Sequence, residues 1–575
     1  MLFLEGLVAR FFESFAVVVT VGVMVSLLVS LTLTPMLCSR FMTVGGSHGP
    51  VYRFLDRILA ALDASYRAAL DWTLRHRLKV LLATLAIVAT SGVLFERLGK
   101  DFIPQDDDGR FQVFFRGPLG TSREAMSEFA LEIERTIAAH PEIKSLFIGV
   151  GLGGIGQVNT GTAFIDMVPL QERSISQAQM IATLQAELAT IPGVFASVAA
   201  PSPIGGQRGE QLQFSVVGPE LGAVAELSRQ LLAELGSDPA MGRIDLDLQL
   251  DLPQLKLEVD RERAADVGLG TAEVAYAVNL LAGGIDVARF NDVPGDGDRY
   301  DLRLKAADGE ITTADDLRRI FLRTPQGQLV RLDTVARGSE VIGPAVINRF
   351  GLQYAANFYS NPTLPLGTAT QRVQAAAAEL LPPGYSLELQ GRTREFAKTS
   401  GYVAFAFGLA LVLVYIVLAS QFNSFIQPLI VMTAQPLAMV GGLFALWVTG
   451  STLNMISMIG LVLLIGLVAK NSILLVDLTN QLRAQGRPVD VALREACPVR
   501  LRPVLMTSLT VILAMLPAAL GLGAGAETNR PMAIAVIGGM VSSTLLTLVV
   551  VPTVYSAIES GLARWRRHRT GSLAA

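Results

Sequence analysis

Seven long apolar stretches divide this chain, and they constrain its fold more than any other feature of the sequence. The first runs from Phe15 to Cys38, and six more lie near residues 78–98, 402–422, 428–448, 453–478, 504–522 and 531–556. About 20 consecutive apolar residues cross the hydrocarbon core of a bilayer as a helix. The first stretch is too long for a signal-peptide core and lacks a cleavage site, so it too is predicted to span the membrane.

The composition agrees with a membrane protein and excludes several other classes. Of 575 residues, 51% are hydrophobic and only 17% are charged, which is less charge than soluble domains carry. A net charge of −3 gives no reason to expect a nucleic-acid partner. The two cysteines, Cys38 and Cys497, suggest neither a disulfide framework nor a cysteine metal site.

Basic residues predict which side of the membrane each connecting segment faces. Arginines are abundant in residues 39–77, 481–503 and 557–575. With seven spans, all three segments fall on one side, and an excess of basic residues marks the cytoplasmic side. We therefore expect a cytoplasmic amphipathic connector at 39–77, a basic cytoplasmic tail at 557–575, and residues 99–400 on the opposite side.

Residues 99–400 are predicted to form an aqueous α+β domain with an internal repeat. "RFQVFFRG", "TSREAMSEFALEIERTIAAH" and "IKSLFIGV" indicate strand, helix and strand, and "TAFIDMV", "SQAQMIATLQAELATI" and "VFASVAA" repeat that order. A third unit begins at "QLQFSVVG", and a fourth is formed by "QYAANFYS", "GTATQRVQAAAAELL" and "YSLELQG". Such units are typical of ferredoxin-like βαβ subdomains.

The repeat gives the expected division of the whole chain. One subdomain is predicted at 99–200, and a second is predicted from two halves at 201–259 and 346–400, with an α+β insertion at 260–345 between them. Residues 1–38 and 78–98 are the first two spans, and 401–556 hold the other five. Thr121 with Glu124, and Ser176 with Gln179, have the spacing of a capping box at two helix starts.

Motifs that would indicate a cofactor or catalytic site are weak or absent from the sequence. "GVGLGG" (149–154) matches a dinucleotide fingerprint, but loop and strand follow it instead of a helix, which favours a flexible glycine loop. Three carboxylates in "DFIPQDDDGR" could hold a cation, although a solvated strand entry is favoured. There is no P-loop, no metal-ligand spacing of histidines and no catalytic triad. We predict no catalytic residues, no cofactor and no metal site.

One charged residue, Lys470 in "GLVAKNSILLVD", stands in the middle of an apolar stretch. It lies about ten residues from the cytoplasmic end, or roughly 15 Å deep at 1.5 Å per residue, near the centre of a ~30 Å core. A lysine side chain of about 6 Å cannot reach water from there. Asp477 is two turns away, and Thr507 can supply a hydroxyl but no counter-charge. An intramembrane lysine indicates a functional site, and its acidic partner is missing from the sequence.

These motifs resemble the C-terminal half of a resistance-nodulation-division (RND) multidrug efflux transporter of the hydrophobe/amphiphile efflux type. The resemblance covers essentially the whole chain and is carried by "GLVAKNSILLVD", "RLRPVLMTSL", "ASQFNSFIQPLIVM", "PLAMVGG", "FIPQDDDG" and "GGMVSSTLLTLVVVPTVY". The implied fold is an α-helical polytopic membrane protein that corresponds to span six and spans seven to twelve. Its large α+β periplasmic domain would contain porter subdomains and, at 260–345, a docking subdomain.

The resemblance also implies a function and partners. It implies export of amphiphilic compounds from the Gram-negative inner membrane, driven by proton flow, without enzymatic chemistry. Lys470 resembles the relay lysine, Thr507 its hydroxyl partner and Arg500 the arginine at the cytoplasmic end of the proton path. The expected assembly is a homotrimer with a periplasmic adaptor protein and an outer-membrane channel.

Two departures from the family pattern leave alternatives open. The family's paired aspartates lie in a span that precedes Met1, so the sequence is expected to be a truncated or split product that lacks the N-terminal half. Leu152 and Ile155 replace a phenylalanine-rich loop. The residues expected to contact substrate are Phe111, Phe114, Phe147, Leu152, Ile155, Phe164 and Phe214. The alternatives are a relative that translocates lipid or protein, and an inactive fragment.

Overall fold

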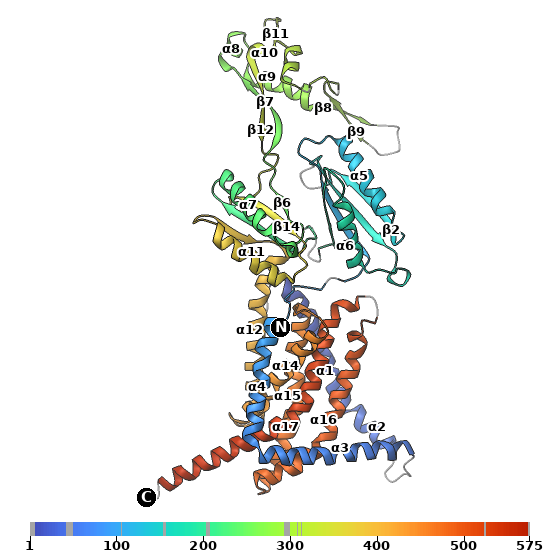
Figure 1. The fold of residues 1–575 in the computed structure, drawn as a ribbon, viewed down its shortest axis with the longest axis vertical. Coiled ribbons are helices and arrows are strands. Elements are labelled where there is room, and N and C mark those ends of the chain that lie inside the picture. Colours follow the sequence, from blue (N-terminus) through green and yellow to red (C-terminus); the bar gives the residue numbers. More distant parts are fainter. Residues whose placement is uncertain are drawn as a thin grey trace.

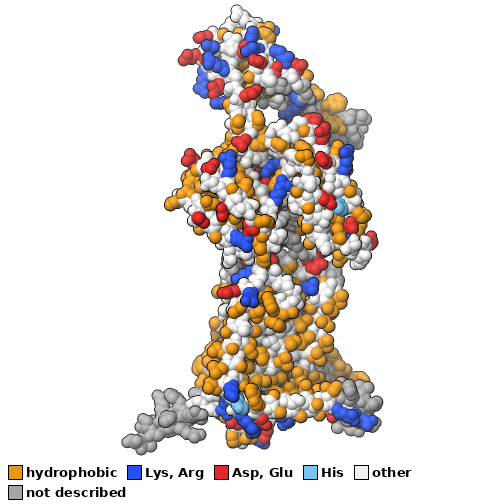
Figure 2. All heavy atoms as spheres, viewed as in Figure 1, with side chains coloured by type: hydrophobic (Ala, Val, Ile, Leu, Met, Phe, Trp, Pro, Cys, Tyr) orange, Lys and Arg blue, Asp and Glu red, His pale blue; other side chains and the backbone are white. Residues whose placement is uncertain are grey.

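The computed structural model describes residues 6–41, 50–104, 106–152, 157–202, 208–291, 299–307, 309–311, 313–522 and 525–572. The molecule is elongated, with a helical bundle at one end, two strand-containing subdomains in the middle and a small insertion at the far end (Figure 1). Hydrophobic side chains cover the visible face of the bundle, and charged side chains gather at its end and over the strand-containing parts (Figure 2). This distribution is that of a membrane protein with a large aqueous domain.

Seven helical stretches in the described residues are long and apolar enough to cross a membrane, as predicted. They are formed by α1 (Gly6–Leu31) with α2 (Leu33–Phe41), α4 (Arg77–Arg97), α12 (Gly391–Phe422), α13 (Gln427–Met432) with α14 (Ala434–Val448), α15 (Met455–Ala484), α16 (Val489–Ala519) and α17 (Ala526–Ser572). The interruption at Thr433 has a local cause, because Pro436 has no N–H for the carbonyl four residues earlier.

Two helices extend well beyond their apolar cores. The prediction placed the start of the sixth span at residue 504, but α16 begins at Val489 and buries Ala492, Ala496 and Cys497 on one side. The predicted start at residue 402 was also late, because α12 begins at Gly391 directly after the last strand. Hydropathy detects only the lipid-facing length of a helix, so amphipathic extensions are missed.

The connector between the first two spans is the amphipathic helix α3 (Pro50–Arg75), which lies across the end of the bundle (Figure 1). Tyr66, Leu70 and Leu74 are buried at four-residue spacing, which places them on one face. The Tyr66 hydroxyl donates to the Leu548 carbonyl at 2.8 Å. Burial, with Cys497 nearby, raises the pKa of Tyr66 far above its usual value. These contacts attach α3 to α17.

Subdomain 1 contains β1 (Arg110–Arg116), α5 (Arg123–Ala138), β2 (Ile143–Val150), β3 (Thr160–Met167), α6 (Gln177–Leu188) and β4 (Phe195–Ala199). The elements follow the predicted order. Their antiparallel sheet has the strand order β2-β3-β1-β4. Phe111, Val113 and Phe115 alternate along β1 and are buried against the helices, while Phe114 and Arg116 lie on the opposite, open face.

One of the two predicted capping boxes is present. Ser176 caps α6 and pairs reciprocally with Gln179. The prediction for Thr121 was wrong, because the N-cap of α5 is Ser122, whose hydroxyl accepts from Ala125 N at 3.2 Å. The Thr121 hydroxyl instead donates to the Pro118 carbonyl within the preceding turn.

Subdomain 2 contains β5 (Leu212–Gly218), α7 (Leu221–Gly236), β6 (Asp245–Asp247), β13 (Arg349–Phe350), β14 (Gln353–Ser360), α11 (Leu366–Leu380) and β15 (Ser386–Leu389). The sheet order is β13-β14-β5-β15, and β6 also pairs with β14. Phe214 and Phe358 face each other across β5 and β14, and their ring centroids are 4.6 Å apart. This core is therefore assembled from two segments far apart in the sequence.

A ribbon of two strands carries the insertion away from subdomain 2 (Figure 1). Strands β7 (Leu252–Val259) and β12 (Ala336–Gly343) pair over their whole length. Beyond them lie α8 (Arg261–Asp266), α9 (Thr271–Val278), β8 (Ile285–Asn291), β9 (Arg299–Leu304), β10 (Phe321–Arg323), β11 (Leu329–Arg331) and α10 (Leu332–Val335). A small core around Leu317 and Leu332 holds this unit together, and the β8–β9 hairpin projects sideways.

Candidate functional site

Lys470 lies on an open stripe of α15. Gly466, Lys470 and Gln481 are exposed and Asp477 is half-buried, at the spacing of one helix face. A Cβ added at Gly466 would meet no atom within 4 Å. The lysine makes no hydrogen bond or ion pair within the described part of the chain, and Asp477 accepts from Gln481 at 2.9 Å. The ammonium therefore sits in the apolar zone on the surface of the bundle, without a counter-ion among these residues.

The next residue of α15 begins a chain of polar side chains across three helices. The Asn471 amide, 3% exposed, donates to Ser508 Oγ at 3.2 Å and accepts from the Thr507 hydroxyl at 3.3 Å. Ser508 also lies 2.7 Å from the Thr544 hydroxyl on α17. We call Asn471, Thr507, Ser508 and Thr544 the polar chain. It links α15, α16 and α17 immediately beside the lysine.

The structure places the two other residues of the predicted proton path, Thr507 and Arg500, on α16. That Thr507 is the hydroxyl partner of Lys470 stays a prediction, and in this structure the Thr507 hydroxyl lies 3.3 Å from Asn471 Oδ1 and 3.0 Å from the Val504 carbonyl. Arg500 is half-buried on α16, and its Nε is buried without a partner in the described residues. Two turns separate Arg500 from Thr507, about 10 Å along the helix axis.

Sequence reasoning missed Asn471, Ser508 and Thr544. A signal was present, since each is a polar residue inside an apolar stretch, in "AKNS", "MTSL" and "VSST". Serine and threonine lower hydropathy far less than a lysine does. Their alignment depends on how three helices are rotated, which the sequence does not state.

The residues expected to contact substrate separate into buried and exposed groups. Phe111 and Phe214 are 2% and 1% exposed and belong to the cores of subdomains 1 and 2. In this conformation they stabilise the sheets and present no surface to a substrate. Ile155 lies outside the described residues.

Phe147, Leu152 and Phe164 are exposed and close together, and we call them the open aromatic face. Phe147 and Phe164 are register partners on β2 and β3, and their ring centroids are 6.3 Å apart. Leu152 folds back over Gly149, where a Cβ would lie only 1.9 Å from its Cδ1. The open aromatic face covers the β2–β3 side of the sheet, away from α5 and α6.

The β1–β4 half of the same sheet face is tied to subdomain 2 by a charged network. Arg116 on β1 lies 2.5 Å from the Asp245 carboxylate on β6, which is 2% exposed. Arg208 lies 2.6 Å from Asp245 and 2.6 Å from Glu210, and Ser197 on β4 donates to Glu210 at 3.1 Å. We call Arg116, Asp245, Arg208 and Glu210 the inter-subdomain network.

Aromatic rings enclose this network. The Arg208 guanidinium carbon lies 4.0 Å from the Phe114 ring centroid and 4.1 Å from that of Tyr359. Burial lowers the pKa of Arg208, but Glu210 and Asp245 raise it more, so the net pKa is raised. Burial, followed by the charge of Asp247, raises the pKa of Tyr359 to about 12. Phe114 therefore contacts a cation and is not part of the open aromatic face.

In the acidic cluster at 106–108, Asp106 and Asp108 are exposed before β1, as expected of a solvated strand entry, whereas Asp107 is half-buried. Asp107 forms a largely buried ion pair with Arg173 and accepts from Gln177 N, at the start of α6, at 2.9 Å. Its own backbone amide donates to Glu527 on α17 at 2.9 Å. Asp106 accepts from the Thr528 hydroxyl. The cluster joins subdomain 1 to the outer end of α17.

Comparison with known proteins places these features in a family. The chain is 30% identical over 565 residues to multidrug resistance protein MdtC of Pectobacterium carotovorum subsp. carotovorum (strain PC1), covering 96% of this chain and 54% of that protein. It is 31% identical over 583 residues to MdtC of Edwardsiella ictaluri (strain 93-146), covering 99% and 56%. The chain thus spans about half the length of the curated relatives it matches.

The fold has a counterpart among solved structures. The crystal structure of a heavy metal efflux pump (crystal form II) superposes with a TM-score of 0.78 at 24% identity, over 88% of this chain and 53% of that one. At that identity the likeness concerns the fold. The sequence profile of the AcrB/AcrD/AcrF family matches residues 1–559. A match over nearly the whole chain shows that this protein belongs to the AcrB/AcrD/AcrF family of RND transporters.

Proposed function

We propose that this chain forms part of an RND permease that exports small amphiphilic compounds and couples export to inward proton flow. The single observation that carries the proposal is Lys470, an ammonium on an open stripe in the apolar zone with no acidic partner in the described residues. A charge in hydrocarbon is costly unless it is paired. Acidic groups beside Lys470 in the assembled permease would supply that pair, and their protonation would release the lysine.

In this proposal, the release of the lysine changes the contacts of the polar chain. Asn471 is adjacent to Lys470 on α15 and contacts Thr507 and Ser508 on α16, while Ser508 contacts Thr544 on α17. A small rotation of α15 would therefore change contacts on both neighbouring helices. Such two-state repacking of helices can drive larger domain movements. Arg500, nearer the cytoplasmic end of α16, is the proposed entry side of the proton path.

The aqueous parts take the remaining roles in the proposal. Subdomains 1 and 2 would be porter subdomains, and the insertion carried by β7 and β12 would dock onto neighbouring proteins. We place the bundle in the inner membrane with residues 99–390 in the periplasm. The proposed assembly is a homotrimer with a periplasmic adaptor protein and an outer-membrane channel, as is usual for RND pumps.

The open aromatic face is the proposed substrate surface. Phe147 and Phe164 are 62% and 49% exposed, and Leu152 is 44% exposed. Exposed apolar groups on an otherwise polar domain mark binding surfaces. Their lack of charge suits amphiphiles with apolar bodies.

The proposal is tested by dye efflux in the organism that encodes the chain. Lys470→Met should abolish energy-dependent ethidium efflux, because the acidic partners would lose their counter-ion, while the amount of chain in the membrane should stay unchanged. The matched control is Lys144→Met, which removes an exposed lysine of subdomain 1 and should leave efflux intact. An uncoupler should reproduce the Lys470→Met phenotype.

Two results would contradict the proposal. Efflux that persists in Lys470→Met would remove the lysine from the coupling mechanism. Efflux that depends on ATP after the proton gradient has collapsed would remove proton coupling. Phe147→Ala with Phe164→Ala should lower dye efflux but leave Lys470-dependent proton uptake, which separates the substrate surface from the energy site.

A further inference from the structure

A cavity of about 370 Å³ lies where the aqueous domain meets the bundle. Its wall includes the linker before β1, the segment after β4, the first turn of α12 and the start of α17. Ile103, Pro104, Ala200 and Pro201 provide apolar surface, and Arg392 and Asp106 provide charge. The volume is within the range of pockets for small organic molecules, roughly 300–1,000 Å³.

Arg392 is the unusual member of this wall. It is 3% exposed, and its Nη2 donates to the Ile103 carbonyl at 3.3 Å. Its Nε and Nη1 are buried and have no partner in the part of the chain that the structure describes. Arg392 makes no ion pair with those residues, although the charge of the Asp101 carboxylate acts on its guanidinium. A buried guanidinium with two unused donors is costly unless something accepts from it.

The acidic residues of the wall are already engaged. Asp106 accepts from the Thr528 hydroxyl, and Asp108 lies 3.7 Å from Arg110 and accepts from its backbone amide at 3.0 Å. The unused hydrogen-bonding groups of Arg392 are the N–H donors on Nε and Nη1. Arg392 is also in the first turn of α12, where the helix dipole favours a negative charge.

We propose that this cavity binds a small organic monoanion, with a carboxylate that accepts hydrogen bonds from Arg392 and an apolar body against Ile103, Pro104, Ala200 and Pro201. Hydrogen bonds between a guanidinium and a carboxylate are among the strongest that side chains make. The nearby carboxylates of Asp106 and Asp108 disfavour a doubly charged phosphate or sulfate. The site is independent of Lys470 and of the open aromatic face, so it goes beyond the proposed export function.

The test measures binding to the full chain in a neutral detergent, using two probes of nearly equal size. 2-Naphthoate carries the carboxylate, and 2-naphthamide replaces it with a neutral amide. Calorimetric titration should show at least tenfold tighter binding of 2-naphthoate. Both probes enter detergent micelles, so the same titrations on variants identify the part of the signal that belongs to the cavity.

Arg392→Met should abolish the tenfold preference, while Arg392→Lys should retain part of it. The matched control is Arg394→Met, which removes an exposed arginine from the same helix turn and should bind like the wild type. Equal binding of the two probes to the wild type, or an unchanged preference in Arg392→Met, would overturn the proposal. A cavity that holds only water would give no saturable binding of either probe and would also overturn it.

Discussion

Subdomains 1 and 2 enclose their cores within the chain, whereas the helical bundle leaves several helices largely uncovered. Val113, Phe115 and Ile133 of subdomain 1 are fully buried. In the bundle, 61% of the most apolar window of α14, α15 and α17 is buried, compared with 6% for α4 and none for α1. A domain in water must cover its own apolar surface, but lipid or another protein segment can cover a helix in a membrane.

The polar groups show the same contrast. In the inter-subdomain network, buried Asp245 has two arginine partners. In the bundle, Lys470 has none among the described residues, although the polar chain beside it is fully connected. The charges of the inter-subdomain network are thus paired within the chain, whereas the ammonium of Lys470 lies on the exposed face of α15 without a counter-ion among the described residues.

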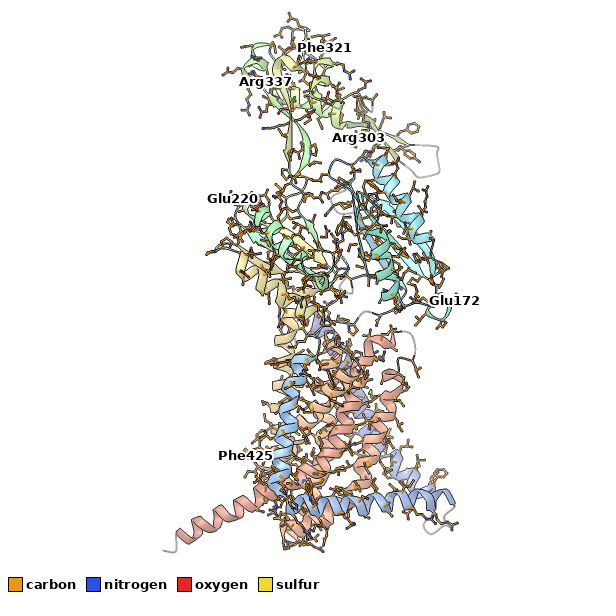
Figure 3. The ribbon with its side chains drawn as sticks, in the orientation of Figure 1. Glu172, Glu220, Arg303, Phe321, Arg337 and Phe425 are labelled. Carbon is orange, nitrogen blue, oxygen red and sulfur yellow. The ribbon has the colours of Figure 1, made fainter. Side chains whose placement is uncertain are left out.

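The sharpest test of this contrast is whether subdomain 2 and the far end of the bundle face different compartments. Figure 3 shows Glu220 in subdomain 2 and Phe425 at the opposite end, in the bundle. After Cys38 is replaced by serine, a membrane-impermeant maleimide added to whole cells should label Glu220→Cys and not Gln485→Cys, because both positions are exposed and the proposed topology puts them on opposite sides of the membrane. Labelling of Gln485→Cys alone would invert the topology.

The next largest effect should come from Asp245. Asp245→Asn leaves Arg116 and Arg208 without their shared carboxylate, and breaking a buried ion pair typically costs about 3–5 kcal/mol. Hydrogen exchange of β1 and β6 should report this loss as easier opening. The control is Asp315→Asn, whose side chain is 81% exposed and pairs with Arg318 at 3.3 Å, for which less than about 0.5 kcal/mol is expected. Equal effects would mean that the network does not hold the subdomains together.

A smaller effect on stability is expected on α15, where substitutions of the adjacent residues Asn471 and Lys470 should differ in their effect. Asn471→Leu removes contacts to Thr507 and Ser508, and hydrogen bonds between membrane helices contribute about 0.6 kcal/mol on average, so about 1 kcal/mol is expected. Lys470→Met removes an unpaired ammonium from the apolar zone and should be neutral or stabilising. Thermal unfolding of the chain in detergent checks both. Destabilisation by Lys470→Met would reveal a partner for the lysine within the chain.

The smallest effect separates two adjacent residues at the start of α5. Ser122→Ala removes an N-cap, which typically costs about 1 kcal/mol, and exchange of the first-turn amides should accelerate. Thr121→Ala removes only an exposed bond to the Pro118 carbonyl, so a change below about 0.5 kcal/mol is expected. If Thr121→Ala had the larger effect, the cap would have to be reassigned.

The sequence predicted most of the fold because two periodic signals are strong here. Hydropathy located the second span at 78–98, against Arg77–Arg97 in the structure, and alternation located β1 and β2. Hydropathy missed the first part of α16, because Arg494, Arg500 and Arg502 lower the hydropathy of this amphipathic extension. Local patterns identify elements, but charged extensions of a membrane helix look like loops.

The candidate site was predictable only in part, because its contacts depend on how elements are placed in space. Lys470 was identifiable, since a charge in an apolar stretch is conspicuous. The contact between Arg116 and Asp245 joins residues 129 positions apart, and no sequence pattern marks it. The burial of Phe111 and Phe214 follows from which face each strand turns toward its helices.

The joint at residues 106–108 gives α17 the geometry of a lever. At its outer end, Glu527 and Thr528 are bonded to Asp107 and Asp106 beneath subdomain 1, and Thr544 lies 16 residues further along, about 24 Å at 1.5 Å per residue. A tilt of about 5° around Thr544 would therefore displace the joint by ~2 Å, comparable to helix shifts that switch packed interfaces. Pro531 lies just inside the outer end, where its missing N–H permits the arm to bend.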